Sequence, residues 1–243
     1  MIHKKKYRYK PVYKKFVALK KNVQNRSKLL NFKKRKWQFL LAQLAKISKT
    51  RKNNCYYKFY DQNVYVTPKY NNFFSKNYKQ NLLNKRSFNL FYGNLEEKYL
   101  KRNVLKSKAA SNKVQNKINS KLFFKDALER RLDSTLLRSH FVLSIMNAKQ
   151  LISHGHVFLN GETVSDASIL VKKGDVITFS PKSHKLIKYF VLNSPFWPLP
   201  PKNYQISYKT FQIIIIDDSK LFNTSDTFPM WLNFNNVMDS YHN

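Results

Sequence analysis

The sequence is poor in the residues that form disulfide frameworks, metal sites and phosphate-binding loops. Its 243 residues include one cysteine, Cys55, and four glycines. A single cysteine excludes an internal disulfide and a zinc site built from a cysteine cluster. No glycine-rich phosphate loop is present, so an NTPase is unsupported. We therefore expect neither a metal ion nor a cofactor.

Acidic residues are scarce as well. The chain holds 46 Lys and Arg against 13 Asp and Glu, a formal net charge of +33. Such a chain repels itself unless a polyanion neutralises it, and nucleic acid is the obvious polyanion. An acidic membrane surface is the alternative, but the sequence lacks both an apolar run of about 18 residues and a large amphipathic stripe beside the charge. The composition favours nucleic acid as the partner and no membrane.

The first acidic residue is Asp61, so residues 1–60 carry only positive charge. We predict a basic N-terminal arm over this range, in which Trp37–Ile47 has a helical period and turns Phe39, Leu40, Leu44 and Ile47 toward one side. Aromatic residues interleave with the cations and could stack on exposed bases or pack against neighbouring proteins: Tyr7, Tyr9, Tyr13, Phe16, Phe32 and Trp37. A solvated disordered tail and a targeting peptide remain alternatives.

Residues 129–179 combine turn chemistry and hydrophobic period into a compact α+β unit. Two short amphipathic helices come first, the first capped by Asp133 or Ser134 and the second by Ser144, and the second ends at Gly155. Short apolar runs separated by tight turns follow. The apolar runs are Val157–Leu159 and Val176–Phe179, and the dipeptide Asn160-Gly161 after the first run predicts a tight hairpin turn.

The first helix of this unit is predicted to have a cationic face. Arg131, Thr135 and Arg138 stand at i, i+4 and i+7, which places them on one side of a helix. If the two helices pack antiparallel, Lys149 projects outward near Arg138. We expect this face to contact phosphates.

Several segments of the unit resemble a known family. RRLD at 130–133, AKQLI at 148–152, HGHVFLNG at 154–161 and KKGDVITF at 172–179 closely resemble the small RNA-binding module of ribosomal small-subunit protein four, the S-four domain. Upstream, FYGNLEEKY at 91–99 resembles the segment that precedes this module in the ribosomal protein itself. The four segments of the module are shared by several RNA-binding families. The upstream segment followed by the module is typical of the ribosomal protein family.

The resemblance implies a structural protein that binds small-subunit ribosomal RNA in its five-prime domain, assembles early, and lies among other ribosomal proteins beside the path by which messenger RNA enters. We expect phosphate contacts from Arg130, Arg131, Arg138, Lys149, Lys172 and Lys173, and from Lys33, Lys34, Arg35 and Lys36 in the arm. Gln150 and His154 are expected to contact sugar or base edges. Heavy use of Lys, Asn, Ile, Phe and Tyr suggests AT-rich coding DNA, so we expect a mitochondrial ribosome, with another AT-rich organelle as the alternative.

Two other functions compete with this interpretation. One is a free-standing S-four factor that acts on stalled ribosomal particles or in RNA processing. The other is an enzyme, because Arg131-Leu132-Asp133 also resembles the signature of pseudouridine synthases, in which the aspartate attacks uridine. Too little ordered sequence remains for their catalytic domain, so we expect Asp133 to be a helix cap and the chain not to be an enzyme.

The remaining chain is divided by composition. We predict an aromatic and helical region with a linker over 61–128, in which the polar stretch 106–121 is an extended linker or an exposed helix. The RNA-binding module covers 129–192, and a proline connector with a C-terminal strand tail covers 193–243. The tail is net negative after residue 203, and its strand, Phe211–Ile216, needs a sheet edge or an apolar groove. We expect that partner to be a neighbouring protein.

Overall fold

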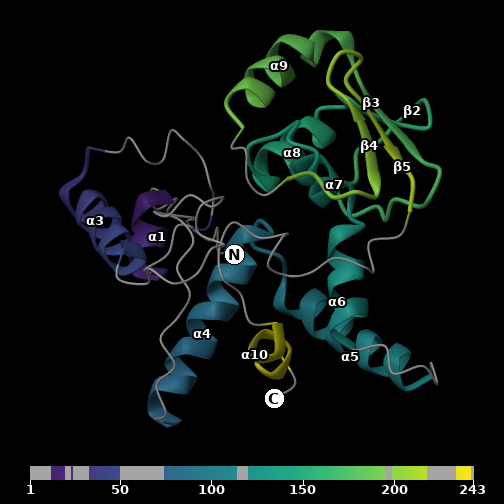
Figure 1. The fold of residues 1–243 in the computed structure, drawn as a ribbon. Coiled ribbons are helices and arrows are strands. Elements are labelled where there is room, and N and C mark those ends of the chain that lie inside the picture. The colour runs from purple at the N-terminus through teal and green to yellow at the C-terminus, as the bar shows by residue number, and fades with distance from the viewer. Residues whose placement is uncertain are drawn as a thin grey trace, which may run out of the picture.

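A computed structural model of the chain describes residues 12–19, 23, 33–49, 74–113, 120–194, 199–217 and 234–241. Cys55, the aromatic residues between 50 and 73, Tyr7, Tyr9, Phe32 and the side chain of Tyr13 lie outside what is described. The described chain is an α+β structure, in which helices precede an antiparallel sheet of five strands (Figure 1). No helix in these residues has the length and apolar character needed to cross a membrane.

The helical part is built around one hydrophobic core. It comprises α1 (Val12–Leu19), α3 (Arg35–Lys49), α4 (Phe74–Phe91), α5 (Glu97–Lys113), α6 (Ser120–Glu129) and the late helix α10 (Phe234–Asp239). The Phe88 ring lies at the centre, 5.8 Å from the ring of Phe124 on α6 and 5.8 Å from that of Phe234 on α10. The last helix of the chain therefore packs against helices that precede the sheet.

The basic arm contributes to this core, which corrects part of the sequence interpretation. The expected helix is confirmed within α3, but the indole of Trp37 is buried and packs 5.9 Å from the Phe16 ring on α1. Neither ring is free to stack on a base. Phe39, expected on the inward side, is exposed, because Trp37 and Leu40 take the buried positions.

The second core lies between the sheet and three helices. Its helices are α7 (Leu132–Arg138), α8 (Ile145–Ser153) and α9 (His184–Leu192), the last following the 3-10 turn Pro181–Ser183. Its strands are β1 (Val157–Leu159), β2 (Glu162–Thr163), β3 (Val176–Phe179), β4 (Tyr204–Ser207) and β5 (Gln212–Ile215), in the order β2-β1-β3-β5-β4. Figure 1 shows this unit to one side of α1 and α3.

Local chemistry confirms most of the predicted turns. The Ser144 hydroxyl accepts a hydrogen bond from the backbone N–H of Asn147 at 3.3 Å and caps α8. Asn160 and Gly161 both have positive φ, 53° and 90°, as a tight hairpin between β1 and β2 requires. The predicted cap of α7 is wrong, because Arg131 is the N-cap residue and the Asp133 side chain pairs with it.

The C-terminal strand is confirmed, but its expected partner is corrected. β5 pairs with β3 through Val176 opposite Ile214, and with β4 on its other side. Ile213 and Ile215 are buried in the second core. The strand therefore finds its sheet edge within the same chain. The polar stretch after residue 105 is helical as far as Lys113, where α5 ends.

Candidate RNA-binding surface

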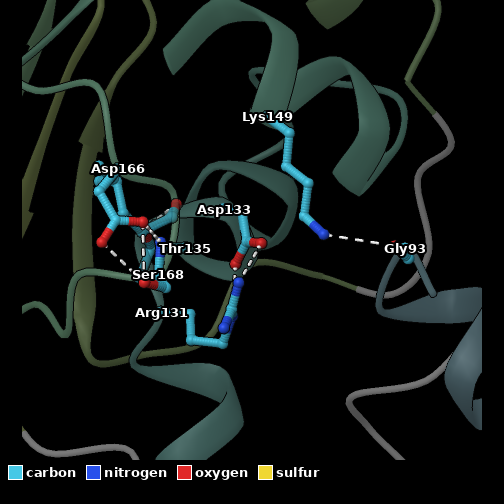
Figure 2. A network of polar contacts seen from close by, with 8 residues as sticks. Gly93, Arg131, Asp133, Thr135, Lys149, Asp166 and Ser168 are labelled. Carbon is cyan, nitrogen blue, oxygen red and sulfur yellow. Dashed lines mark hydrogen bonds and ion pairs between the residues drawn. The ribbon is translucent and has the colours of Figure 1, made fainter. Parts of the chain in front are cut away.

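Arg131 and Asp133 form a buried ion pair at the start of α7. Arg131 Nε donates to Asp133 Oδ1 at 3.0 Å, and Nη2 donates to Oδ2 at 2.8 Å (Figure 2). The backbone around them is held by the loop between β2 and β3, since Leu132 N–H donates to the Ile169 carbonyl at 2.9 Å. The prediction that Arg131 contacts phosphate is therefore not supported by its position, because its side chain is buried against Asp133.

Arg138 is buried in a second ion pair, which also joins the two cores. Its Nε and Nη2 donate to the two carboxylate oxygens of Glu129, each at 2.7 Å, and the Tyr92 hydroxyl donates to Glu129 Oε1 at 2.6 Å. The guanidinium lies 5.2 Å from the Phe91 ring centre. Only about 5% of either charged side chain is exposed. Arg138 thus faces inward, which corrects the expected cationic face of α7.

The pKa shifts follow from this burial. Burial alone would raise the pKa of the Glu129 carboxyl, but the Arg138 charge and the hydrogen bonds it receives lower that pKa overall. Burial alone would lower the pKa of Arg138, but the Glu129 carboxylate raises it overall. Burial, with the Glu129 charge nearby, raises the pKa of the Tyr92 hydroxyl. All three groups keep their ordinary protonation states at neutral pH.

Lys149 on α8 contacts the turn between α4 and α5 rather than Arg138. Its Nζ donates to the Gly93 carbonyl at 3.3 Å, as Figure 2 shows. Gly93 has φ of 72°, and a Cβ there would lie 3.1 Å from Ile145 Cγ2, so this close approach requires glycine. Burial lowers the pKa of Lys149. The side chain is half-buried and ties α8 to the helical part.

Most of the other predicted contact residues are exposed. Arg130 is partly exposed and donates from Nε to the Val171 carbonyl at 3.2 Å. Lys173 Nζ lies 3.7 Å from Asp217 Oδ1, and both side chains are mostly exposed. The rest are open to solvent: Gln150, His154, Lys172, Lys33, Lys34, Arg35 and Lys36.

The exposed residues form three groups rather than one cluster. His154 is the C-cap of α8 and lies next to the end of β3, where Ser180 N–H donates to the His156 carbonyl at 3.0 Å. Lys172 and Lys173 precede the start of β3, so the strand separates the two groups by about 13 Å at roughly 3.3 Å per residue. Lys33 and Lys34 precede α3, and Arg35 and Lys36 are its first residues; in Figure 1 this helix lies on the opposite side of the molecule from the sheet.

Comparison with known proteins identifies the sheet-containing unit. A family model described as the S4 domain, the module written above as S-four, matches residues 130–177. The match covers α7, α8, β1, β2 and the start of β3, but not β4 and β5, which extend the sheet. A Sphingopyxis alaskensis protein named "Small ribosomal subunit protein uS4" is 39% identical over 103 residues, covering 42% of this chain and 47% of that protein.

Two further relatives have names that differ from this one only in a final letter. The Eimeria tenella protein "Small ribosomal subunit protein uS4c" is 36% identical, covering 50% of this chain and 58% of its own length. The Reclinomonas americana protein "Small ribosomal subunit protein uS4m" is 28% identical over 192 residues, covering 73% of this chain and 72% of its own. The chain is therefore similar to proteins named uS4, and its residues 130–177 match the S4 domain. It spans about half the length of most of the relatives it matches.

A further cationic surface, which the sequence analysis did not assign, lies along α5. Lys98, Lys101, Arg102 and Lys106 are exposed along α5. Their spacing of i, i+3, i+4 and i+8 places them on one side of the helix, and this spacing is visible in the sequence EKYLKRNVLK. Among the described residues, no group of three His, Cys, Asp or Glu side chains is placed to hold a metal ion.

Proposed function

We propose that the chain is a structural component of a small ribosomal subunit and binds the ribosomal RNA of that subunit, in its five-prime domain. The match of the S4 domain to residues 130–177 carries this proposal, because these residues lie in the folded unit that exposes Lys172 and Lys173 before β3 and Gln150 and His154 near its other end. Similarity to the Reclinomonas americana uS4m protein over 73% of the chain supports a mitochondrial ribosome. The resemblance supports a place among other ribosomal proteins beside the path of incoming messenger RNA.

The exposed polar and charged side chains contact the RNA, and the buried ion pairs stabilise the fold. Lys172, Lys173 and the α5 stripe neutralise phosphates and set the orientation of the protein on the RNA, while Gln150 and His154 hydrogen-bond to sugars or base edges. The buried pairs of Arg131 and Arg138 maintain the fold that presents them. An RNA helix has phosphates along its whole length, so contact groups separated by a strand suit an extended RNA surface.

The proposed mechanism is binding and not catalysis. A pseudouridine synthase would need the Asp133 carboxylate to reach a uridine, but both of its oxygens accept hydrogen bonds from Arg131 inside the fold. The alternative function is that of a free-standing S-four factor. Such a factor would make the same RNA contacts but would dissociate from the ribosome.

We also propose a revised division of the chain. Residues 129–217 act as the RNA-binding unit, because β4 and β5 complete its sheet and core. The N-terminal helices and α10 form the second unit around Phe88.

Sedimentation of the native protein tests the proposal. A structural component stays with the small subunit in high salt at about one copy per particle. A protein released from the subunit by high salt, or present in a small fraction of particles, would be a factor instead.

A further inference from the structure

The outer face of α9 exposes three large apolar side chains on successive turns. Leu186 is 45% exposed, Tyr189 is 53% exposed and Leu192 is 75% exposed. Single exposed leucines are common on protein surfaces, but a row of three on one nine-residue helix is a feature of interaction sites. The opposite side of α9 is used for folding, because Ile187 and Phe190 are buried in the second core.

Contacts at both ends hold α9 in place. At its start, His184 Nε2 hydrogen-bonds with the Phe179 carbonyl at 3.2 Å. Beyond its end, His140 Nδ1 and Ser194 Oγ are 2.5 Å apart, which ties the helix to the turn after α7. The Asn193 side-chain amide donates to the Tyr189 carbonyl at 2.8 Å. The exposed row is thus presented on an ordered helix, which reduces the conformational entropy lost on binding.

The positive charge on the outer side of α9 indicates that the partner carries negative charge. Lys185 and Lys188 are exposed on the same outer side, and the helix contains no Asp or Glu. A groove lined with apolar side chains and edged by carboxylates would match both features. Helices bind such grooves through anchors about one turn apart, as Leu186, Tyr189 and Leu192 are.

We propose that α9 docks into an apolar, carboxylate-edged groove of another protein of the particle. RNA fits this face less well, because phosphates would engage the lysines and leave aliphatic Leu186 and Leu192 without apolar contact. The inference rests on the proposed function only in placing that protein in the small subunit.

A photocrosslink decides between the possible occupants. Tyr189 is replaced by photoreactive p-benzoylphenylalanine in the full-length chain, cells are irradiated, and the chain is purified under denaturing conditions. Mass spectrometry then identifies the crosslinked peptide. Tyr78 on α4, which is 74% exposed, receives the same replacement as a matched control.

The expected product is one protein peptide with Asp or Glu beside apolar residues, seen from position 189 and not from position 78. Leu186→Gln combined with Leu192→Gln should lower its yield about tenfold, since a helix binds an apolar groove through anchors of this kind. Thermal unfolding of this variant should be unchanged, because both positions are exposed. A crosslink to RNA, a crosslink to a second copy of the chain, no crosslink, or an unchanged yield would overturn the proposal. Sedimentation from the same cells shows separately whether the proposed function holds.

Discussion

Replacement of Glu129 tests whether the two cores are joined by the buried network around this carboxylate. Glu129 accepts two hydrogen bonds from Arg138 at 2.7 Å and one from Tyr92 at 2.6 Å. Glu129→Ala removes all three acceptor contacts. It leaves the Arg138 guanidinium buried without its carboxylate partner and the Tyr92 hydroxyl without its acceptor.

The expected loss in the free energy of unfolding is about 3–5 kcal/mol, the range for removing one member of a buried ion pair. With a urea dependence of about 2 kcal/mol per molar, the midpoint of unfolding should fall by roughly 2 M. Arg138→Met combined with Glu129→Ala should recover part of the loss, because replacing both partners with apolar groups removes the isolated charge.

Urea unfolding of the full-length chain, followed by circular dichroism, measures these changes. Glu97→Ala is the matched control, because Glu97 pairs with Lys85 at 3.0 Å while 73% of its side chain is exposed. Exposed pairs contribute about 0–1 kcal/mol. If Glu129→Ala costs no more than Glu97→Ala, the network does not hold the cores together.

The same carboxylate predicts a pH dependence. Its folded pKa is lowered from the ordinary value of 4.5, so its stabilisation is complete above pH 4.5 and is lost as the pH falls through the folded pKa. The difference in stability between the wild type and Glu129→Gln should therefore shrink below pH 4.5. A difference that stays constant into strong acid would show that the Glu129 pKa is not lowered by folding.

Three further predictions concern the RNA contacts, the hairpin and the last strands. Lys98→Gln with Lys101→Gln should reduce the slope of log affinity for small-subunit RNA against log salt by about 1–2, at roughly 0.7–0.9 per phosphate contact, in a fluorescence anisotropy salt series; an unchanged slope would remove α5 from the RNA surface. Gly161→Ala should lower stability by about 1–2 kcal/mol in a thermal melt, because alanine is strained at a φ of 90°. The strain of the backbone is the whole effect, since an added Cβ would meet no atom within 4 Å. An unchanged melting temperature would contradict the left-handed turn. Truncation after Lys202 removes β4, β5 and α10. It should abolish cooperative unfolding of the second core through loss of the two strands, and it should also weaken the first core through loss of Phe234; an unchanged transition would show that the sheet does not need β4 and β5.

The parts of the fold that sequence predicts well are those set by neighbouring residues. Ser144 as a helix cap, the Asn160-Gly161 hairpin and the strand Val176–Phe179 depend on backbone preferences within a few positions, and all are confirmed. The strand after Phe211 was also recognisable from its isoleucines. Its partner was not, because pairing with β3 depends on how the chain returns across about 35 residues.

The candidate site was predictable in its charge and not in its geometry. Helical spacing placed Arg131 and Arg138 on one face, but Arg131 is buried in an ion pair with Asp133 at the start of α7, and Arg138 packs inward against Glu129. Lys149 contacts a carbonyl 56 positions earlier in the sequence. Long-range partners of this kind determine which cations are exposed, and no local pattern specifies them.

The identity of the RNA bound in cells tests the central claim most directly. The native chain is crosslinked to RNA by ultraviolet light in intact cells, purified under denaturing conditions, and the attached RNA is sequenced. We predict that small-subunit ribosomal RNA dominates the reads and that crosslinks cluster in its five-prime domain. Reads dominated by transfer RNA, messenger RNA or large-subunit RNA would contradict the assignment of this chain to the small ribosomal subunit.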